Sequence, residues 1–435
     1  MKKILLLCSA LLCAGVSMAQ YKWVSLPNAP TNGGKQDDIY FVTPTTGWSI
    51  NGSGRIYKTS DGGNSWTKQI DKPGTYFRCV GFIDSLTGFA GNIGTAYFPG
   101  VTDTIPLYKT TDGGVNWLPV TNISGPTVKG LCAIDVVNDK VVYAAGRVGS
   151  PVHLIKSTDS GKTWTSKDMS AHCAMILDLK FFGPDTGFVF TASDASVPSS
   201  HAQVLYTTDG GQTFTTVYTS SRFNEICWKA SFPSRKTGYL TILSYDPLNN
   251  NRYVAKTTDG GLTWTDLPLV NNGCKEFGIG FVSDHVGWVG SDLSGYETTD
   301  GGATWQSKNL GVYTNKIRVI PDGANFVAYA IGRNIFKLSA AKPSSINTVA
   351  NSSGQIVVSP NPVNAALSIQ LLDASANKEY TITVYNTLGA KIKTAPLLIN
   401  GNGKGTLNVS DLAGGTYTIV VSSGTKQYTQ KIQIK

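Results

Sequence analysis

Six aspartates recur in one local pattern, and a carboxylate is a side chain that can act as a general acid or base. Each belongs to a Ser/Thr-x-Asp-x-Gly-x-x-aromatic string, and the six pairs are Asp61 and Trp66, Asp112 and Trp117, Asp159 and Trp164, Asp209 and Phe214, Asp259 and Trp264, and Asp300 and Trp305. Catalysis needs one acid rather than six, whereas an aspartate can accept hydrogen bonds from its own turn and glycine allows positive φ. We therefore expect six structural hairpin turns, each covered by its aromatic residue.

The segments before these turns also repeat. A Gly-aromatic pair such as Gly47-Trp48 stands about twelve residues ahead of most turns, and an apolar segment such as 39–41 precedes it. Each period therefore predicts four short strands, which make one blade of a β-propeller. A seventh period without its turn follows at 317–336, and residues 21–26 are expected to supply its outer strand and close the ring. We expect seven blades, with six or eight as the alternatives.

This architecture predicts where chemistry could be placed. In a meander of strands a to d, the b–c turns share one face with the d-to-a crossovers, and the aspartate turns belong to the other face. The longest insertions, 92–104, 192–203 and 244–251, are b–c turns, and loops on a rigid scaffold often carry function.

Charged residues in the crossovers and early inner strands are expected at the channel mouth on the b–c face. The candidate binding residues are Asp38, Arg78, Lys129, His172, Asp178, Glu225, Lys229, Glu276 and Lys316. Asp37, Asp135, Lys180, Lys275 and Arg318 belong to the same predicted ring. The alternative is that these charges are solvated or pair with one another.

The N-terminus has the features of a signal peptide. Lys2 and Lys3 precede an apolar run and then small residues up to Ala19, after which we expect cleavage. A lipoprotein anchored at Cys13 is the alternative, but Leu12 stands where a small residue is expected. No other stretch approaches the length of a membrane-spanning helix, so no transmembrane segment is expected.

Composition narrows the possible functions. The formal net charge of +9 is spread along the chain, which does not favour a nucleic-acid binder. Five cysteines follow the signal region without C-x-x-C spacing, and we expect them to be small buried residues of inner strands. His153, His172, His201 and His285 have no spacing typical of metal ligands. With no P-loop or dinucleotide motif either, no cofactor and no metal are expected.

The C-terminal region has a different composition. Residues 341–355 are polar and predict a linker, and 356–435 alternate short strands with glycine turns, which predicts a small Ig-like β-sandwich. The motifs Pro360-Asn-Pro362, Val384-Tyr-Asn-Thr-Leu-Gly389 and Leu412-Ala-Gly-Gly-Thr-Tyr417 together resemble the type A sorting domain of type IX secretion. The resemblance implies export across the outer membrane by that machinery, removal of the tail, and release or attachment to surface lipopolysaccharide. An adhesive Ig-like domain is the alternative.

The propeller repeat also resembles known families. Its turns match the Asp-box (BNR) pattern, and the complete repeat is similar to the photosystem II assembly and stability factor family. That resemblance implies a protein-binding propeller without catalysis, and Arg55, Arg147 and Arg333 would correspond to that family's basic face. Sialidases need a Phe/Tyr-Arg-Ile-Pro motif near the N-terminus, but the nearest string here, Arg318-Val-Ile-Pro321, lies at the other end. Xyloglucanase-like hydrolases place their carboxylates between tandem propellers, and this chain predicts one propeller.

The sequence thus predicts an all-β protein with a signal peptide at 1–19, a propeller at 20–340, a linker at 341–355 and a sorting domain at 356–435. We expect a secreted or cell-surface module that binds a glycan or a protein through the b–c face. The alternative is an extracellular glycoside hydrolase or lyase with an unrecognised site. Two carboxylates about 5 to 10 Å apart in a walled cleft would favour the hydrolase.

Overall fold

The computed structural model describes residues 21–31, 33–95, 97–343, 356–372, 379–386, 390–423 and 426–435. The chain divides into two compact units between Pro343 and Ser344. The expected signal peptide and most of the expected linker lie outside the described residues. Within the described part of the chain, no helix is long and apolar enough to cross a membrane.

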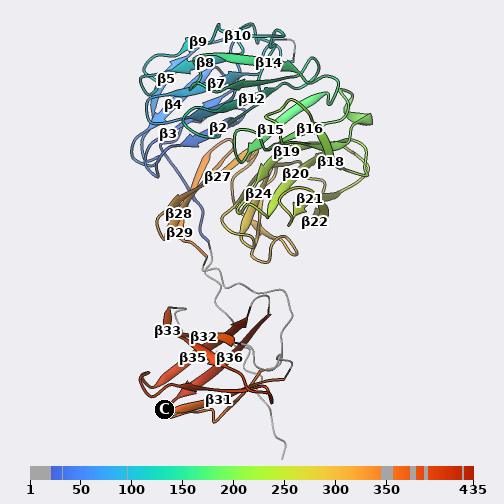
Figure 1. Cartoon of the computed structure of the whole chain (residues 1–435). Coiled ribbons are helices and arrows are strands. Elements are labelled where there is room, and N and C mark those ends of the chain that lie inside the picture. The colour runs from blue at the N-terminus through green and yellow to red at the C-terminus, as the bar shows by residue number, and fades with distance from the viewer. Residues whose placement is uncertain are drawn as a thin grey trace, which may run out of the picture. The chain divides into compact units, whose positions relative to one another are not determined.

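Seven sheets of the described residues form the first unit, a seven-bladed β-propeller (Figure 1). The first three blades are β2 (Gln36–Phe41), β3 (Gly47–Asn51), β4 (Arg55–Thr59) and β5 (Thr67–Asp71); β6 (Phe77–Phe82), β7 (Gly88–Asn92), β8 (Leu107–Thr110) and β9 (Leu118–Pro119); and β11 (Ala133–Val136), β12 (Val142–Gly146), β13 (His153–Ser157) and β14 (Trp164–Asp168). The third blade gains a fifth strand, β10 (Ile123–Ser124), which runs parallel to β14.

The remaining blades follow the same order of strands. They are β15 (Met175–Phe181), β16 (Gly187–Ala192), β17 (Ala202–Thr207) and β18 (Thr215–Thr219); β19 (Glu225–Ser231), β20 (Gly238–Ser244), β21 (Asn251–Thr257) and β22 (Thr265–Asn271); β23 (Glu276–Phe281), β24 (Gly287–Ser291), β25 (Gly295–Thr298) and β26 (Gln306–Lys308); and β27 (Lys316–Asp322), β28 (Asn325–Ile331), β29 (Ile335–Ala341) and β1 (Val24–Ser25). A short 3₁₀ helix, η1 (Val197–Ser199), lies between β16 and β17.

The N-terminal segment closes the ring, as the sequence predicted. Strand β1 pairs antiparallel with β29, so that Val24 lies opposite Lys337. Trp23 packs edge-on against Trp288 of the sixth blade at a ring distance of 5.4 Å. Joining the first and last segments in one blade leaves no open edge between them, and this confirms the expected count of seven blades.

The six repeated aspartates fix hairpin turns, which we call the aspartate turns. In the first, Asp61 Oδ1 accepts the backbone N–H of Ser65 at 2.9 Å, and Thr59 Oγ1 accepts the N–H of Gly63 at 2.8 Å. The other five turns repeat these bonds. Hydrogen bonds from Ser65 lower the pKa of Asp61 to about 2. The carboxylates are thus occupied in shaping their turns.

Each aspartate turn also contacts the preceding blade. Lys337 Nζ and Tyr329 Oη donate to the carbonyl of Gly62 at 2.7 and 2.9 Å. Lys256 and Tyr239 do the same for Gly301 at 2.8 and 3.1 Å. Lys256, which opens the Lys-Thr-Thr-Asp string of the fifth blade, therefore holds the aspartate turn of the sixth blade, and Lys337 of the last blade holds that of the first.

The C-terminal unit is a β-sandwich of two sheets. One sheet contains β30 (Ile356–Ser359), β31 (Ala366–Leu371) and β34 (Lys404–Asn408), and the other contains β33 (Lys391–Leu398), β32 (Glu379–Asn386), β35 (Gly415–Ser423) and β36 (Lys426–Ile434). Alternate residues such as Leu367, Ile369, Ile382 and Val384 are buried in its core. This alternation is the pattern expected for strands with one buried face, and the predicted sandwich is confirmed.

The five cysteines of the propeller behave as small core residues. Cys79, Cys132, Cys173, Cys227 and Cys274 are all buried and form no disulfide with one another. Cys79 and Cys227 lie within the inner strands β6 and β19, and the other three lie one or two residues before inner strands.

Candidate binding cavity

A cavity of about 680 Å³ lies on the b–c face, where b–c turns and the first residues of inner strands meet. Its lining includes Ser53, Tyr97, Val148, Val197, Tyr245 and Arg333 from b–c turns. Phe277 and Lys275 add the sixth blade, so all seven blades contribute. This is the volume range of small-ligand sites in proteins.

Aromatic side chains dominate the lining. They are Tyr76, Tyr97, Phe98, Trp228, Tyr245, Phe277 and Tyr313. Tyr76 and Phe98 are stacked with their ring centroids 4.8 Å apart, whereas Tyr97 is 47% exposed. The long insertion between β7 and β8 supplies Tyr97 and Phe98, which places exposed rings beside buried ones. Such a wall can contact the apolar faces of a ligand.

Four basic side chains complete the lining, and each lies against an aromatic ring. Arg78 lies 5.0 Å from the Trp228 ring, Lys275 5.4 Å from Tyr245 and Arg333 4.8 Å from Tyr313, while Lys35 contacts both Trp228 and Phe277. Asp37 is the acidic residue in the lining, and its Oδ1 pairs with Arg78 Nη1 at 2.7 Å. Basic groups therefore outnumber acidic groups, and the cavity favours an anionic ligand.

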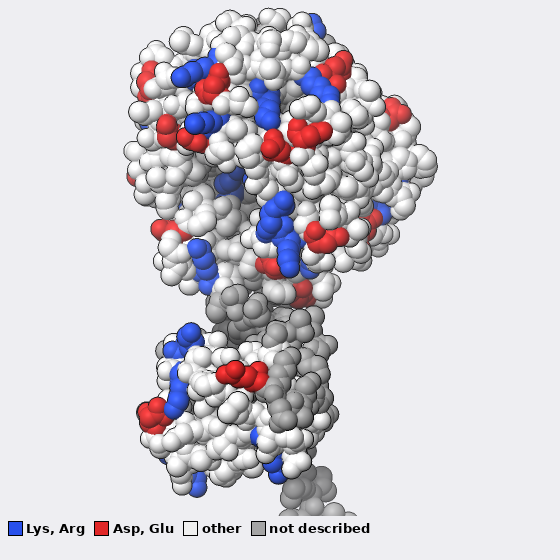
Figure 2. Space-filling model, in the orientation of Figure 1, with Lys and Arg blue, Asp and Glu red and all other residues white. Residues whose placement is uncertain are grey.

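The outer surface does not show the same imbalance. Figure 2 shows basic and acidic side chains interspersed over the visible face of the propeller. The charge preference consequently comes from the cavity lining rather than from a basic patch on that face.

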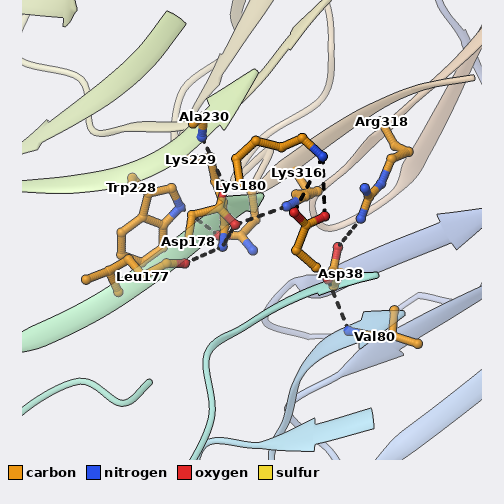
Figure 3. A network of polar contacts seen from close by, with 12 residues as sticks. Asp38, Val80, Leu177, Asp178, Lys180, Trp228, Lys229, Ala230, Lys316 and Arg318 are labelled. Atoms are coloured by element: carbon orange, nitrogen blue, oxygen red, sulfur yellow. Dashed lines mark hydrogen bonds and ion pairs between the residues drawn. The ribbon is translucent and has the colours of Figure 1, made fainter. Parts of the chain in front are cut away.

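A network of ion pairs lies deeper along the inner strands (Figure 3). Asp178 Oδ1 lies 3.6 Å from Lys229 Nζ and 3.5 Å from Lys316 Nζ, and its Oδ2 accepts the N–H of Ala230 at 3.0 Å. Burial raises the pKa of Asp178, but the two lysines outweigh burial, so the pKa lies below its usual value. Burial lowers the pKa of Lys229 to about 8 despite its contact with Asp178.

A second part of the network joins the first and last blades. Asp38 Oδ1 lies 3.7 Å from Arg318 Nη2, and Asp38 Oδ2 accepts the N–H of Val80 at 3.1 Å. Asp135 pairs with Lys180 at 3.4 Å. These contacts tie inner strands of different blades together.

The structure separates the nine predicted binding residues. Arg78 lines the cavity, whereas Asp38, Asp178, Lys229 and Lys316 belong to the ion-pair network. Glu225 pairs with Arg222 at 2.5 Å and Glu276 with Arg252 at 3.7 Å. Lys129 is exposed outside the lining, and the His172 ring packs 5.5 Å from Phe214.

An open ring of charges was therefore the wrong expectation for most of these residues. Arg78, Asp178, Glu225, Lys229 and Glu276 are all buried, and buried charges require partners. These residues instead follow the alternative given above, in which the charged side chains pair with one another. Burial raises the pKa of Glu276 well above its usual value.

Sequence reasoning missed the aromatic lining and Lys35. Tyr97, Phe98 and Tyr245 stand in two of the three long b–c insertions, so the insertions themselves carried a usable signal. Trp228 and Phe277 gave no such signal, because inner strands of a propeller commonly carry aromatic core residues.

Comparisons with known proteins agree with this architecture. Residues 357–435 match the secretion system C-terminal sorting domain. The protein is an exported β-propeller. The type IX machinery handles chains that carry this domain, and their destination is the cell surface or the extracellular space.

Solved structures support the propeller fold. YCF48 bound to D1 peptide is 17% identical with a TM-score of 0.53, covering 76% of this chain and 98% of that one. YCF48 from Cyanidioschyzon merolae is 18% identical with a TM-score of 0.54, covering 73% and 98%. An ancestral GH74 enzyme is 12% identical with a TM-score of 0.53, covering 95% of this chain and 64% of that chain. No curated protein matches the sequence significantly.

Proposed function

We propose that this protein is a secreted or cell-surface binding module that holds a glycan or protein ligand in the cavity on its b–c face. The observation that carries the proposal is a cavity of about 680 Å³ whose wall combines seven aromatic rings with four basic side chains. Aromatic walls supply contact area, and a few placed polar groups supply orientation, which is the usual composition of a ligand site. The excess of basic groups favours an anionic ligand.

The carboxylates near the cavity support binding over hydrolysis. A glycoside hydrolase of the common kind needs two carboxylates about 5 to 10 Å apart, whereas Asp37 is the acidic residue among the described lining residues. Asp37 is also paired with Arg78. The ancestral GH74 enzyme shares the fold, so a hydrolase or lyase remains the second candidate, and a neighbouring propeller bound to a peptide makes a protein ligand compatible with the fold.

The proposal includes the route to the cell surface. Residues 1–19 are the proposed signal peptide, and residues 341–355 are the proposed linker to the sorting domain. The aspartate turns are proposed to be Asp boxes, because each contains the Ser/Thr, Asp, Gly and aromatic residues of that motif. Arg55 and Arg147 are not needed for this site, since neither is part of the cavity lining.

Binding can be tested on a glycan array and by capture of surface proteins, with a glycosidase assay beside both. Arg333→Glu is the informative variant, because Arg333 is exposed at the cavity and lies over the Tyr313 ring. Arg235→Glu is its matched control, since Arg235 is exposed in the β19–β20 turn and lies 4.0 Å from the Phe182 ring.

We expect Arg333→Glu to lower the affinity for the ligand about tenfold or more, which is a loss of about 1.4 kcal/mol of binding free energy. Arg235→Glu should leave the affinity unchanged. Equal losses in both variants would contradict the location of the site. Release of sugar products by the purified protein would establish the hydrolase instead.

A further inference from the structure

Lys35 occupies an unusual place for a lysine. It stands just before β2 and lines the cavity, where its Nζ lies 5.1 Å from the centre of the Trp228 ring and 5.2 Å from that of Phe277. The Nζ also donates a hydrogen bond to Asn315 Oδ1 at 3.0 Å. The amine is therefore held at the wall of a ligand-sized cavity between two rings.

Asn315 fixes this arrangement from the last blade. Its side chain is fully buried, and Oδ1 also accepts the Trp228 Nε1–H at 3.1 Å, while Nδ2 donates to the Asp37 carbonyl at 2.7 Å. One amide thus positions Lys35, the Trp228 ring and the backbone of β2. Because it is neutral, Asn315 orients the amine without stabilising its charged form as a carboxylate would.

The surroundings of Lys35 favour the neutral amine. Burial, with Arg78 and Lys229, lowers its pKa to about 7, although Asp37 and Cys132 act in the opposite direction. The two aromatic rings also favour the ammonium form, but burial is the larger effect. Desolvation and a neighbouring cation are the conditions that activate a lysine as a nucleophile.

We propose that Lys35 is a nucleophilic lysine that captures an aldehyde bearing a carboxylate as a reversible imine. The Nζ lone pair attacks the carbonyl carbon, and the carbonyl oxygen gains a proton from the amine. The nitrogen of the resulting carbinolamine gives up its remaining proton, and the hydroxyl leaves with a proton as water when the C=N bond forms. Amine and aldehyde thus give imine and water without an oxidant or reductant. Lys275 and Arg333 attract the carboxylate, and this inference rests on the cavity being the ligand site.

Reductive trapping tests the proposal on the exported chain. Glyoxylate is the probe, and cyanoborohydride converts its imine with lysine into carboxymethyllysine, which peptide mass spectrometry locates. At pH 7 we expect Lys35 to be modified about tenfold or more faster than the exposed Lys22, because the lowered pKa of Lys35 leaves more of its amine neutral and nucleophilic. Equal rates at Lys35 and Lys22 in the folded protein would overturn the proposal.

Two variants isolate the role of Asn315. Asn315→Asp places a carboxylate beside Lys35, which raises the pKa of the amine and should slow its modification about tenfold. Asn138→Asp is the matched control, since Asn138 is exposed in the β11–β12 turn and its Oδ1 accepts backbone N–H groups that an aspartate can also accept. Modification of Lys35 at the same rate in both variants would refute the positioning role of Asn315.

The aldehyde class is tested separately with propionaldehyde, which lacks a carboxylate. We expect glyoxylate to modify Lys35 faster, and equal rates would overturn the requirement for a carboxylate. The trapping experiment and the binding experiment can fail independently. The first measures the modification of Lys35 by mass spectrometry, whereas the second measures the affinity lost in Arg333→Glu. If the protein binds a ligand but Lys35 is not trapped, the proposed binding function stands and the proposed imine is refuted.

Discussion

Replacing Asp178 by alanine removes the carboxylate that contacts both Lys229 and Lys316 in the propeller channel. The Asp178 and Lys229 side chains are 7% and 5% exposed, and that of Lys316 is 13% exposed. Removing one partner of a buried ion pair costs about 3 to 5 kcal/mol, because an uncompensated charge stays behind. Lys229 keeps its hydrogen bond to the Leu177 carbonyl at 2.7 Å, so we expect a loss near the lower end of this range.

The pH dependence gives this prediction a second readout. Asp178 raises the pKa of Lys229, which is about 8 in the intact protein, so the Asp178→Ala variant should release this proton at lower pH. Between that lower pKa and pH 8 the folded variant binds fewer protons than the intact protein, and its stability rises more steeply with pH. The stability difference should therefore narrow by about 1 kcal/mol or more between pH 6 and pH 9, since one pKa unit corresponds to about 1.4 kcal/mol.

Urea unfolding followed by tryptophan fluorescence is the assay. All nine tryptophans lie between Trp23 and Trp305, so the signal reports the propeller alone. Asp178→Asn retains an acceptor for the Ala230 N–H and isolates the effect of charge. Asp71→Ala is the surface control, because Asp71 pairs with the exposed Arg55 and Lys68 and such pairs contribute little. A midpoint for Asp178→Ala equal to that of Asp71→Ala, or a difference that does not change with pH, would refute this reasoning.

Three further predictions follow from the scaffold. Trp164→Ala should lower the free energy of unfolding by about 3 to 5 kcal/mol in the same assay, because Trp164 is 1% exposed and packs edge-on against Phe89; a loss below 1 kcal/mol would count against it. Hydrogen bonds in the aspartate turns lower the pKa of Asp61, Asp112 and Asp259 from 3.8 to about 2, so their stabilisation is complete above pH 3.8 and is lost as the pH falls toward 2. The melting temperature should fall over that interval, and a constant value would be inconsistent with these bonds. Deleting residues 344–435 should leave a folded propeller in the periplasm, because the sorting domain directs export; fractionation that finds it outside the cell at normal levels would contradict this.

The blades could be predicted from the sequence because their signals are local. The aspartate turns use side chains within five residues of one another, and the Gly-aromatic pairs mark the second strand of each blade. The one departure from the repeat also has a structural reason. Glu297 stands at the position where the other copies have Lys or Tyr, and the seventh blade, which follows it, has no aspartate turn for a lysine to contact. Glu297 instead accepts the Trp288 Nε1–H at 2.7 Å. Closure by residues 21–26 could likewise be predicted from an unmatched strand at each end of the repeat.

Which inner-strand charges face the cavity was decided only by the tertiary structure. Register shifts interrupt five inner strands, between Gln36 and Asp38, Phe77 and Cys79, Ile176 and Asp178, Cys227 and Ala230, and Glu276 and Ile279. A bulge adds one residue to a strand and exchanges the faces to which its later side chains point. Alternation along the sequence therefore does not show that Asp37 reaches the cavity while Asp38 joins the network beneath it. Lys35, Trp228 and Asn315 come from three blades, and only the closed ring brings them into contact.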